Sequence, residues 1–195
     1  MTPPWQQHGP NVAFWTLFAV FAVGEYALRI RGGLRKGGRR VERWSLAVVV
    51  ATVGVGLVAG LRLADWNAAE IGTARWVLFV VGLLLMAAGL VIREWAILTL
   101  GRFFTVDVRV HSGQTVVERG PYRWVRHPAY TGLLVFLLGL GLALTNWASL
   151  LVLALLPTLG LLMRIRSEER ALLAGLGDDY RRFAETRSRL FPGIW

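Results

Sequence analysis

Five long apolar runs separated by polar stretches dominate the chain. Each run holds 17 to 23 residues, close to the ~20 that a helix needs to cross the hydrocarbon core of a bilayer. The runs cover residues 12–30, 44–63, 76–98, 129–145 and 147–163. Little more than Asn146 separates the last two runs, which therefore predict a tight helical hairpin. The pattern predicts an all-α, polytopic integral membrane protein with five transmembrane helices.

The cationic residues concentrate in three of the polar stretches, at residues 29–43, 101–126 and 164–187. The stretch at 62–75 has Arg only at its edges, and the Asn146 turn has no cation. Five spans place the three basic stretches on one face, so the positive-inside rule predicts a cytoplasmic C-terminus and an N-terminus outside. No Lys or Arg precedes Arg29, so we expect the first run to be a retained helix rather than a signal peptide.

We expect a single membrane domain over residues 1–195, made of a three-helix N-terminal part (1–100) and a catalytic C-terminal part (101–195). In the second part, the alternation of Val106, Val108 and Val110 with polar residues predicts a short extended stretch. Pro157 is expected to kink the fifth helix. The tail is helical in character up to Arg187, and we expect its apolar end, 190–195, to pack on the membrane surface.

Composition narrows the possible functions. The chain has 195 residues, 55% of them hydrophobic, and a formal net charge of +10. A charge this positive also suits nucleic acid, but basic cytoplasmic loops of a membrane protein, in contact with anionic lipid, explain it better. The chain has no cysteine and its three histidines are scattered, so we expect neither a metal site nor a cysteine nucleophile.

Two polar clusters flank the predicted hairpin and therefore face each other on one side of the membrane. The first, residues 120–130, reads Gly-Pro-Tyr-Arg-Trp-Val-Arg-His-Pro-Ala-Tyr, and the second, residues 164–169, reads Arg-Ile-Arg-Ser-Glu-Glu. Pro128 suits the first turn of a helix, whose free N–H groups can receive an anionic ligand group. Carboxylates, guanidiniums and aromatic rings together suit a zwitterionic, cationic ligand such as S-adenosylmethionine. Two alternatives remain. The clusters could bind a phosphate-bearing nucleotide such as NADPH, or they could be ordinary membrane anchors with surface ion pairs.

Three further ionisable residues lie inside predicted spans. Glu25 falls in the second half of the first run, and we favour an interhelical or interfacial partner role for it over a functional one. Arg93 and Glu94 are adjacent in the third run. Neighbouring residues of a helix point about 100° apart, so we expect only one of these two to face the bundle interior. Arg93, Glu94 and Arg164 are our candidates for contact with a substrate.

The two clusters and their spacing resemble the isoprenylcysteine carboxyl methyltransferase family. Its pattern is an Arg-His-Pro-x-Tyr block, two apolar helices, an Arg-x-x-x-Glu-Glu block, a Tyr-containing stretch and a late Pro. In this chain Arg126-His127-Pro128-Ala129-Tyr130, Arg164 to Glu169, Tyr180 and Pro192 match these features in order. The resemblance covers roughly residues 101–195, whereas the first three runs match only in being apolar.

This resemblance implies a cofactor, S-adenosylmethionine, and a set of residues around it. By position in the motifs, the cofactor-binding residues are Arg126, His127, Pro128, Tyr130, Glu168 and Glu169, with Tyr122 as an aromatic wall. Arg164 is the candidate to orient an acceptor carboxylate, and Arg164 and Glu169 are the candidate catalytic residues. The implied reaction is direct methyl transfer to a lipophilic acceptor, without a metal. The acceptor is expected to be a carboxylate, isoprenylcysteine-like or isoprenoid, or else a lipid headgroup.

Two other functions stay open. An NAD(P)H-dependent membrane reductase of the sterol-reductase type has a similar C-terminal arrangement, although Glu168 and Glu169 would repel its nucleotide phosphates. A non-enzymatic lipid-binding membrane protein is the other. The high Arg-to-Lys ratio and the many Ala, Gly and Val residues indicate a GC-rich bacterial genome, and so the bacterial inner membrane. Since protein prenylation is not a bacterial default, we expect a small lipophilic acceptor.

Overall fold

Five long helices form the body of the protein. The computed structural model describes residues 2–34, 39–42, 44–72, 74–104, 108–110 and 115–194. Within these residues the long helices are α1 (Pro10–Leu34), α2 (Trp44–Leu63), α3 (Arg75–Leu100), α4 (Pro128–Ala143) and α5 (Trp147–Leu176). The shorter α6 (Asp178–Thr186) follows α5, and single turns occur at η1 (Pro4–Gln6), η2 (Asn67–Ala69), η3 (Gly101–Phe103) and η4 (Gly120–Arg123). The predicted five-helix membrane class is confirmed.

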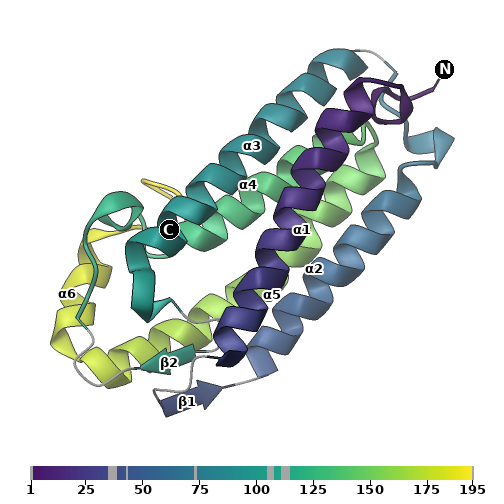
Figure 1. Cartoon of the computed structure of the whole chain (residues 1–195). Coiled ribbons are helices and arrows are strands. Elements are labelled where there is room, and N and C mark those ends of the chain that lie inside the picture. Colours follow the sequence, from purple (N-terminus) through teal and green to yellow (C-terminus); the bar gives the residue numbers. More distant parts are fainter. Residues whose placement is uncertain are drawn as a thin grey trace.

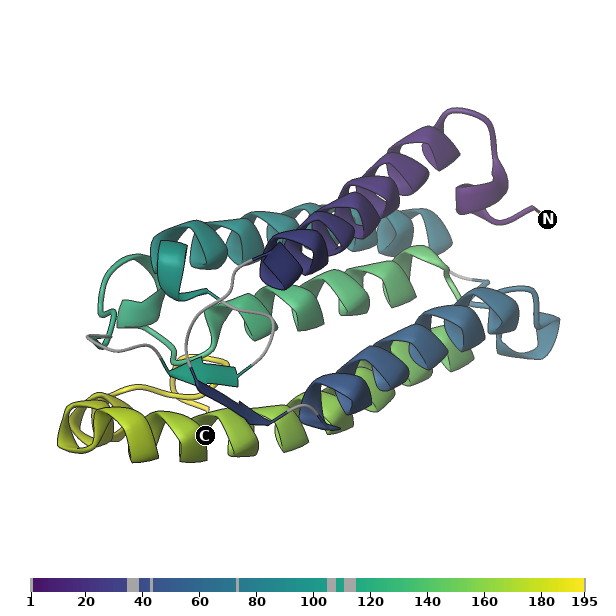
Figure 2. The ribbon, with the colours of Figure 1, turned by 60° about the horizontal axis from the view of Figure 1, so that its bottom comes forward.

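The helices pack in layers around α4. Figures 1 and 2 show α3 beside α4 and α2 beside α5, and in Figure 1 the helix α1 lies in front of these pairs. Four helices are long and apolar enough to span a membrane: α1 up to Leu28, α2, α3 and α5. α4 has 16 residues and is enclosed by its neighbours, with Phe136, Leu137 and Leu140 fully buried. The protein is an integral membrane protein whose innermost helix is its shortest span.

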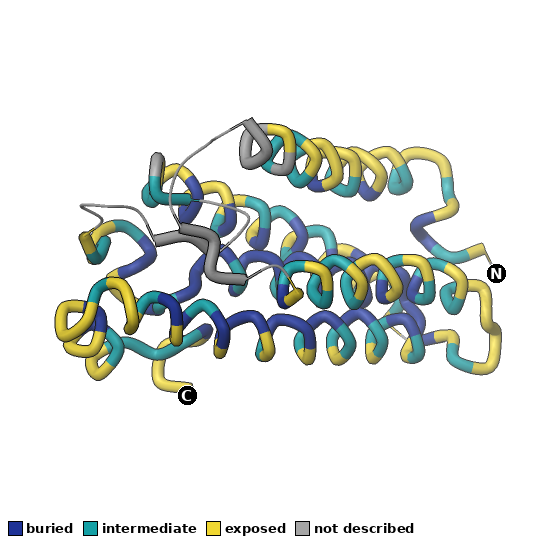
Figure 3. Tube along the Cα trace, turned by 90° about the horizontal axis from the view of Figure 1, so that it is seen from below, coloured by how far each residue is buried: buried dark blue, intermediate teal, exposed yellow. Residues whose placement is uncertain are grey.

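The outward faces of the bundle are apolar, as a lipid-facing surface requires. Val55, Leu84 and Leu155 are each more than half exposed, and the outer faces in Figure 3 are coloured as exposed along every long helix except α4. Exposed tryptophans mark both ends: Trp44, Trp95 and Trp124 at one end, and Trp66, Trp76 and Trp147 at the other. Along α3, Trp76 and Trp95 are about 28 Å apart at 1.5 Å per residue. That span matches a hydrocarbon core of ~30 Å bounded by aromatic belts.

α3 and α4 approach each other backbone to backbone. Glycines make this possible: a Cβ placed on Gly89 would lie 2.5 Å from the backbone nitrogen of Phe136. One placed on Gly132 would lie 2.6 Å from the nitrogen of Arg93. Gly82 and Gly139 repeat the arrangement one heptad away. Without a hydrophobic driving force between helices in lipid, close packing across small residues is what holds such a pair together.

The hairpin of α4 and α5 closes through side-chain caps. Thr145 takes a positive φ of 51°, and the side chain of Asn146 accepts a hydrogen bond from the backbone of Ser149 at 3.1 Å. α5 then continues past the predicted end of the span and past Pro157, without interruption, to Leu176. The tail predicted to be helical up to Arg187 is helical: residues 164–176 belong to the 30-residue α5, and α6 covers Asp178–Thr186.

Two short strands were not part of the predicted all-α class. β1 (Arg39–Glu42) pairs antiparallel with β2 (Val108–Val110), with Arg40 opposite Arg109. The expected extended stretch is confirmed for residues 108–110, whereas Val106 lies outside the described residues. So do residues 35–38 and Arg43 of the basic stretch. The strand pair crosses the Trp95 end of the bundle, beside α5 (Figure 2).

Candidate active site

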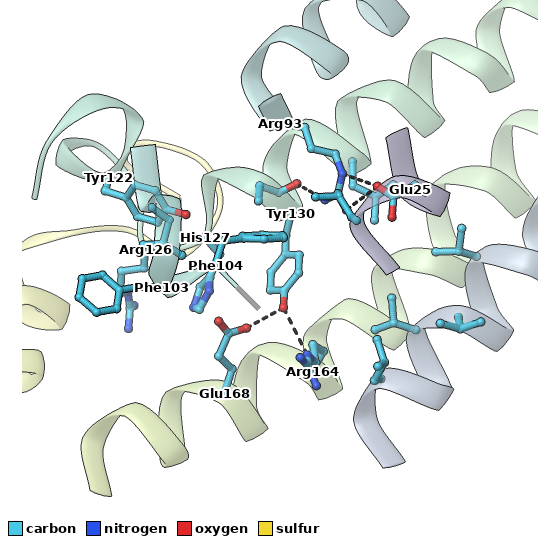
Figure 4. A pocket seen from close by; sticks show the side chains of 18 of the residues that line it. Glu25, Arg93, Phe103, Phe104, Tyr122, Arg126, His127, Tyr130, Arg164 and Glu168 are labelled. Carbon is cyan, nitrogen blue, oxygen red and sulfur yellow. Dashed lines mark hydrogen bonds and ion pairs between the residues drawn. The ribbon is translucent and has the colours of Figure 1, made fainter. Parts of the chain in front are cut away.

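A cavity of about 530 Å³ opens at the Trp95 end of the bundle, where α1 and α2 face α3, α4 and α5. Figure 4 shows its polar end, with Tyr130 at the centre. The polar lining comprises Tyr122, Arg126, His127, Tyr130, Arg164 and Glu168. An apolar arm then runs between α1 and α2, lined by Phe18, Phe21, Val50, Val53, Gly54 and Leu57. The cavity thus joins a polar chamber to an apolar arm inside the membrane.

Tyr130 joins three helices at the centre of the polar end. Its hydroxyl donates to Oε2 of Glu168 at 2.6 Å and accepts from Nε of Arg164 at 3.3 Å (Figure 4). Nη1 of Arg164 donates to the hydroxyl of Ser45 at 2.9 Å, and both of these residues are buried. Arg164 and Glu168, four residues apart on α5, therefore both contact Tyr130 of α4. Ser45 of α2 in turn contacts Arg164.

Glu169 binds three cationic or titratable side chains behind the cavity. Its Oε1 lies 2.7 Å from Nη1 of Arg126 and 3.3 Å from Nε2 of His127. Its Oε2 lies 2.9 Å from Nε of Arg189. Glu169 is 7% exposed and is absent from the cavity wall. From this position Glu169 holds Arg126 and His127, which do line the cavity, and its predicted contact with the cofactor stays a prediction.

The chain end docks on the start of α4 and fixes His127. The backbone nitrogens of Arg126 and His127 donate to the carbonyls of Ser188 and Arg189, at 2.9 and 3.0 Å. Leu190 is 6% exposed, and its carbonyl accepts from the hydroxyl of Thr131 at 2.6 Å. The expectation that residues 190–195 pack on the membrane surface is wrong for Leu190, because strand-like pairing with residues 125–127 draws it onto the protein. Pro128 takes the first turn of α4 as predicted, buried and outside the cavity wall.

Of the two adjacent charges in α3, Arg93 lines the cavity, whereas the carboxylate of Glu94 lies beside α1, with its Oε1 3.7 Å from where a Cβ on Gly24 would be. Arg93 is 8% exposed and lines the cavity; its Nε and Nη2 both lie 2.5 Å from Oε1 of Glu25, and Nη1 donates to the carbonyl of Ala129 at 2.8 Å. Glu94 is exposed and lies away from the cavity wall. Arg93 is thus the member of the pair that lines the cavity, and the substrate roles predicted for Arg93 and Glu94 stay predictions. Glu25 is the interhelical partner that we favoured, and it also lines the cavity.

Two tyrosine hydroxyls outside the spans stay protonated. Burial raises the pKa of Tyr122 well above its usual value, and the Glu168 carboxylate raises it further. Burial also raises the pKa of Tyr180, with Glu169 and Glu168 acting in the same direction. Each hydroxyl is therefore a hydrogen-bond donor throughout the neutral range.

Four buried side-chain donors have no protein partner among the residues that the structure describes: Nε1 of Trp5, Nε of Arg126, the Tyr180 hydroxyl and Nε of Arg187. Of these residues, Arg126 and Tyr180 line the cavity. Unpartnered buried polar atoms are rare and call for a ligand or water. A ligand carboxylate or ring nitrogen would satisfy the donors of Arg126 and Tyr180, and Glu168 would bind an ammonium group. This donor and acceptor set fits S-adenosylmethionine. Among the described residues, no three His, Cys, Asp or Glu side chains cluster as metal ligands.

Arg189, Ser45 and the aromatic pair Phe103 and Phe104 were not among the predicted site residues. Arg189 and Ser45 support Glu169 and Arg164 from segments far away in sequence, and no local pattern marks either residue. Phe103 and Phe104 line the cavity from η3, after α3. An apolar pair within an otherwise polar stretch was the available signal for them.

Comparison with known proteins agrees with this geometry. A family model described as "Isoprenylcysteine carboxyl methyltransferase (ICMT) family" matches residues 80–174. A rice (Oryza sativa subsp. indica) protein described as a probable protein-S-isoprenylcysteine O-methyltransferase is 34% identical over 112 residues, which is 56% of this chain. Protein-S-isoprenylcysteine O-methyltransferase A of Arabidopsis thaliana is 33% identical over 115 residues, 58% of this chain. This chain covers 59% of the rice protein and 58% of the Arabidopsis protein.

A solved structure extends the likeness to the fold of nearly the whole chain. The eukaryotic intramembrane Ras methyltransferase ICMT superposes with a TM-score of 0.68 at 23% identity. The match covers 97% of this chain and 70% of that one, so α1 and α2, which lie outside residues 80–174, also have counterparts in the fold. The chain is therefore similar to the isoprenylcysteine carboxyl methyltransferase family over residues 80–174, and it shares its fold with the solved methyltransferase structure over nearly its whole length.

Proposed function

We propose that this protein is an integral membrane methyltransferase that transfers a methyl group from S-adenosylmethionine to a carboxylate on a lipophilic acceptor. One observation carries the proposal: a single cavity joins the motif residues Arg126, His127, Tyr130 and Glu168 to an apolar arm between α1 and α2. A polar cofactor and an acceptor with an apolar chain would meet where these two environments meet. The carboxyl methyltransferases named among the relatives support this reaction class.

The residues divide into two groups by position. Arg126, Tyr122, Tyr180 and Glu168 would hold the cofactor in the polar chamber, and Glu169 would hold Arg126 and His127 in register behind it. Arg164 would orient the acceptor carboxylate beside Tyr130. When bound, S-adenosylmethionine supplies a sulfonium methyl group, which a carboxylate oxygen accepts without a general base or a metal. The chain's contribution is alignment of the two groups and exclusion of water around them.

The predicted topology completes the proposal. Basic stretches flank the cavity end of the bundle, so the positive-inside rule places that end and the C-terminus in the cytoplasm, with the N-terminus outside. The composition favours a bacterial inner membrane. The chain acts as one membrane domain, in which helices before residue 100 line the acceptor arm and residues 101–195 supply most of the polar chamber. The acceptor is a small lipophilic acid or a lipid headgroup acid drawn from the surrounding membrane.

The first test is cofactor binding by calorimetry on detergent-purified protein. S-adenosylmethionine, its demethylated product and NADPH are titrated separately into wild type and Glu169→Gln. We expect the first two ligands to bind wild type and to lose at least about 100-fold in affinity in the variant, because a buried ion-pair network is broken. Binding of NADPH alone would replace this proposal with the hypothesis of an NAD(P)H-dependent membrane reductase. Binding of none of the three would leave a lipid-binding role.

Transfer itself is tested with radiolabelled S-adenosylmethionine and a panel of lipophilic acids. The panel contains S-prenyl and S-alkyl N-acetylcysteines, free isoprenoid acids and the matching amines. Base-labile radioactivity in an acid acceptor would show ester formation, as we expect. Label only in the amines would assign N-methylation and contradict a carboxylate acceptor.

A further inference from the structure

The first two helices support two guanidiniums that line the cavity where its polar end meets its apolar arm. We infer that Glu25 of α1 and Ser45 of α2 are positioning residues, which hold Arg93 and Arg164 as the subsite for the acceptor's acidic head. The inference rests on the proposed function and extends it to residues outside the matched region, 80–174. It predicts that the N-terminal helices determine how the acceptor head binds, while the cofactor chamber works independently of them.

Ser45 fixes Arg164 from the side opposite Tyr130. Nη1 of Arg164 lies 2.9 Å from the Ser45 hydroxyl, and Nε lies 3.3 Å from the Tyr130 hydroxyl. Ser45 is 0% exposed and Arg164 is 3% exposed, so the contact is shielded from water. Contacts at both sides of one guanidinium set its orientation before a ligand arrives, which lowers the ordering cost of binding a carboxylate.

Glu25 fixes Arg93 in the same manner. The carboxylate engages Nε and Nη2, while the carbonyl of Ala129 accepts from Nη1. Ala129 precedes Tyr130, so Arg93 is tied to the turn of α4 that carries the central hydroxyl. Figure 4 shows Arg93 and Glu25 on one side of Tyr130 and Arg164 on the other.

The lining changes character just beyond these residues. Leu46 and Val49 follow Ser45 along α2, and Phe21 and Ala22 precede Glu25 along α1; all four line the apolar arm. An acceptor whose chain lies in this arm would bring its head to the part of the cavity that Arg93 and Arg164 line. The chemistry of the subsite suits an acid group at the end of an apolar chain, because guanidiniums recognise carboxylates with fixed geometry.

Ser45→Ala tests the first contact, with Ser149→Ala as a matched control. Ser149 is also 0% exposed, and its hydroxyl donates to the carbonyl of Gly60 at 2.7 Å, near the opposite end of the bundle. We expect Ser45→Ala to lower acceptor kcat/KM about 10- to 100-fold, the loss typical of a hydrogen bond to a charged group. The dissociation constant of S-adenosylmethionine should stay within about twofold, and Ser45→Thr should recover most of the loss. Ser149→Ala should leave acceptor kcat/KM unchanged.

Glu25→Gln tests the second contact, with Glu70→Gln, in the loop between α2 and α3 at the opposite end of the bundle, as its control. The amide keeps the shape of Glu25 and removes its charge, so Arg93 loses its orientation. We expect acceptor kcat/KM to fall about tenfold or more, while cofactor affinity is retained. Glu70→Gln should behave as wild type, because Glu70 is an exposed residue 3.9 Å from Arg75 and lies away from the cavity wall.

The readouts separate this inference from the proposed function. If wild type transfers methyl groups but Ser45→Ala and Glu25→Gln match wild type, the positioning roles are wrong and the proposed function stands. If cofactor binding falls as much as acceptor turnover, or if Ser149→Ala is equally impaired, the two residues are purely structural and the inference is overturned. If wild type methylates no acceptor in the panel, the proposed function itself fails.

Discussion

The two walls of the cavity are built differently. On one side, α3 and α4 touch backbone to backbone through Gly82, Gly89, Gly132 and Gly139, with no room for a single added methyl group. On the other side, α1 and α2 border the cavity with side chains, and a Cβ added at Gly54 would meet nothing within 4 Å. The first wall fixes Tyr130 and His127. The second wall has free space, in which the proposed acceptor would fit. The closely packed helices and the helices that border free space are therefore different ones.

The largest expected effect comes from disrupting the close packing of α3 against α4. In Gly89→Leu the new side chain would overlap the backbone of Phe136, so the two helices must separate. Overpacking of this kind costs about 3 kcal/mol or more. Thermal unfolding in detergent should show a large fall in Tm and loss of cofactor binding together. A variant with wild-type Tm would show that the α3–α4 contact is looser than the structure indicates.

Glu169→Gln is expected to have the next largest effect. The substitution leaves Arg126 and Arg189 without their carboxylate in a buried setting, which costs about 3 kcal/mol of folding free energy. Denaturant unfolding measures the loss. Glu118→Gln is the control: Glu118 is 57% exposed at its side chain and 3.7 Å from Arg187, so its ion pair should contribute nothing measurable. Equal effects in both variants would contradict the buried network.

Gly54→Leu tests whether the wall formed by α1 and α2 has free space for an acceptor chain. The new side chain has space and should leave Tm unchanged, while it fills part of the apolar arm. We expect KM for a long-chain acceptor to rise about tenfold through overpacking against the bound chain. Cofactor affinity should not change. Val55→Leu, one residue along on the exposed face of α2, is the control. A wild-type KM in Gly54→Leu would place the acceptor chain elsewhere.

Tyr180→Phe should have the smallest effect. Its hydroxyl has no partner among the described residues, so removing it should leave stability unchanged or slightly higher. Cofactor affinity should fall about fivefold if the hydroxyl donates to the bound ligand. Because the pKa of Tyr180 is raised, wild type and variant should show the same tyrosinate absorbance up to about pH 10. A difference below that pH would mean that the hydroxyl is hydrated.

Sequence reasoning predicted the features that depend on local pattern. The five spans, the Asn146 turn and the clusters around Arg126–Tyr130 and Arg164–Glu169 each reflect periodicity or a short motif. Contacts between distant segments were not predictable in this way. The pairing of Glu169 with Arg189 and of Arg164 with Ser45 depends on how α5, the chain end and α2 pack. That Arg93 rather than Glu94 lines the cavity likewise follows from the α3–α4 glycines, which set the rotation of α3.

The shortness of α4 has a consequence for the energetics of reaching the site. Its 16 residues rise about 24 Å, less than the ~30 Å hydrocarbon thickness. The polar residues that line the cavity at its start therefore lie below the level of the surrounding headgroups, flanked by the longer α3 and α5. Pulling a chain of about a dozen carbons from lipid into water would cost on the order of 10 kcal/mol. The proposed acceptor would avoid this extraction by entering sideways between α1 and α2, so that its head would reach Tyr130 while its chain stayed in the hydrocarbon core.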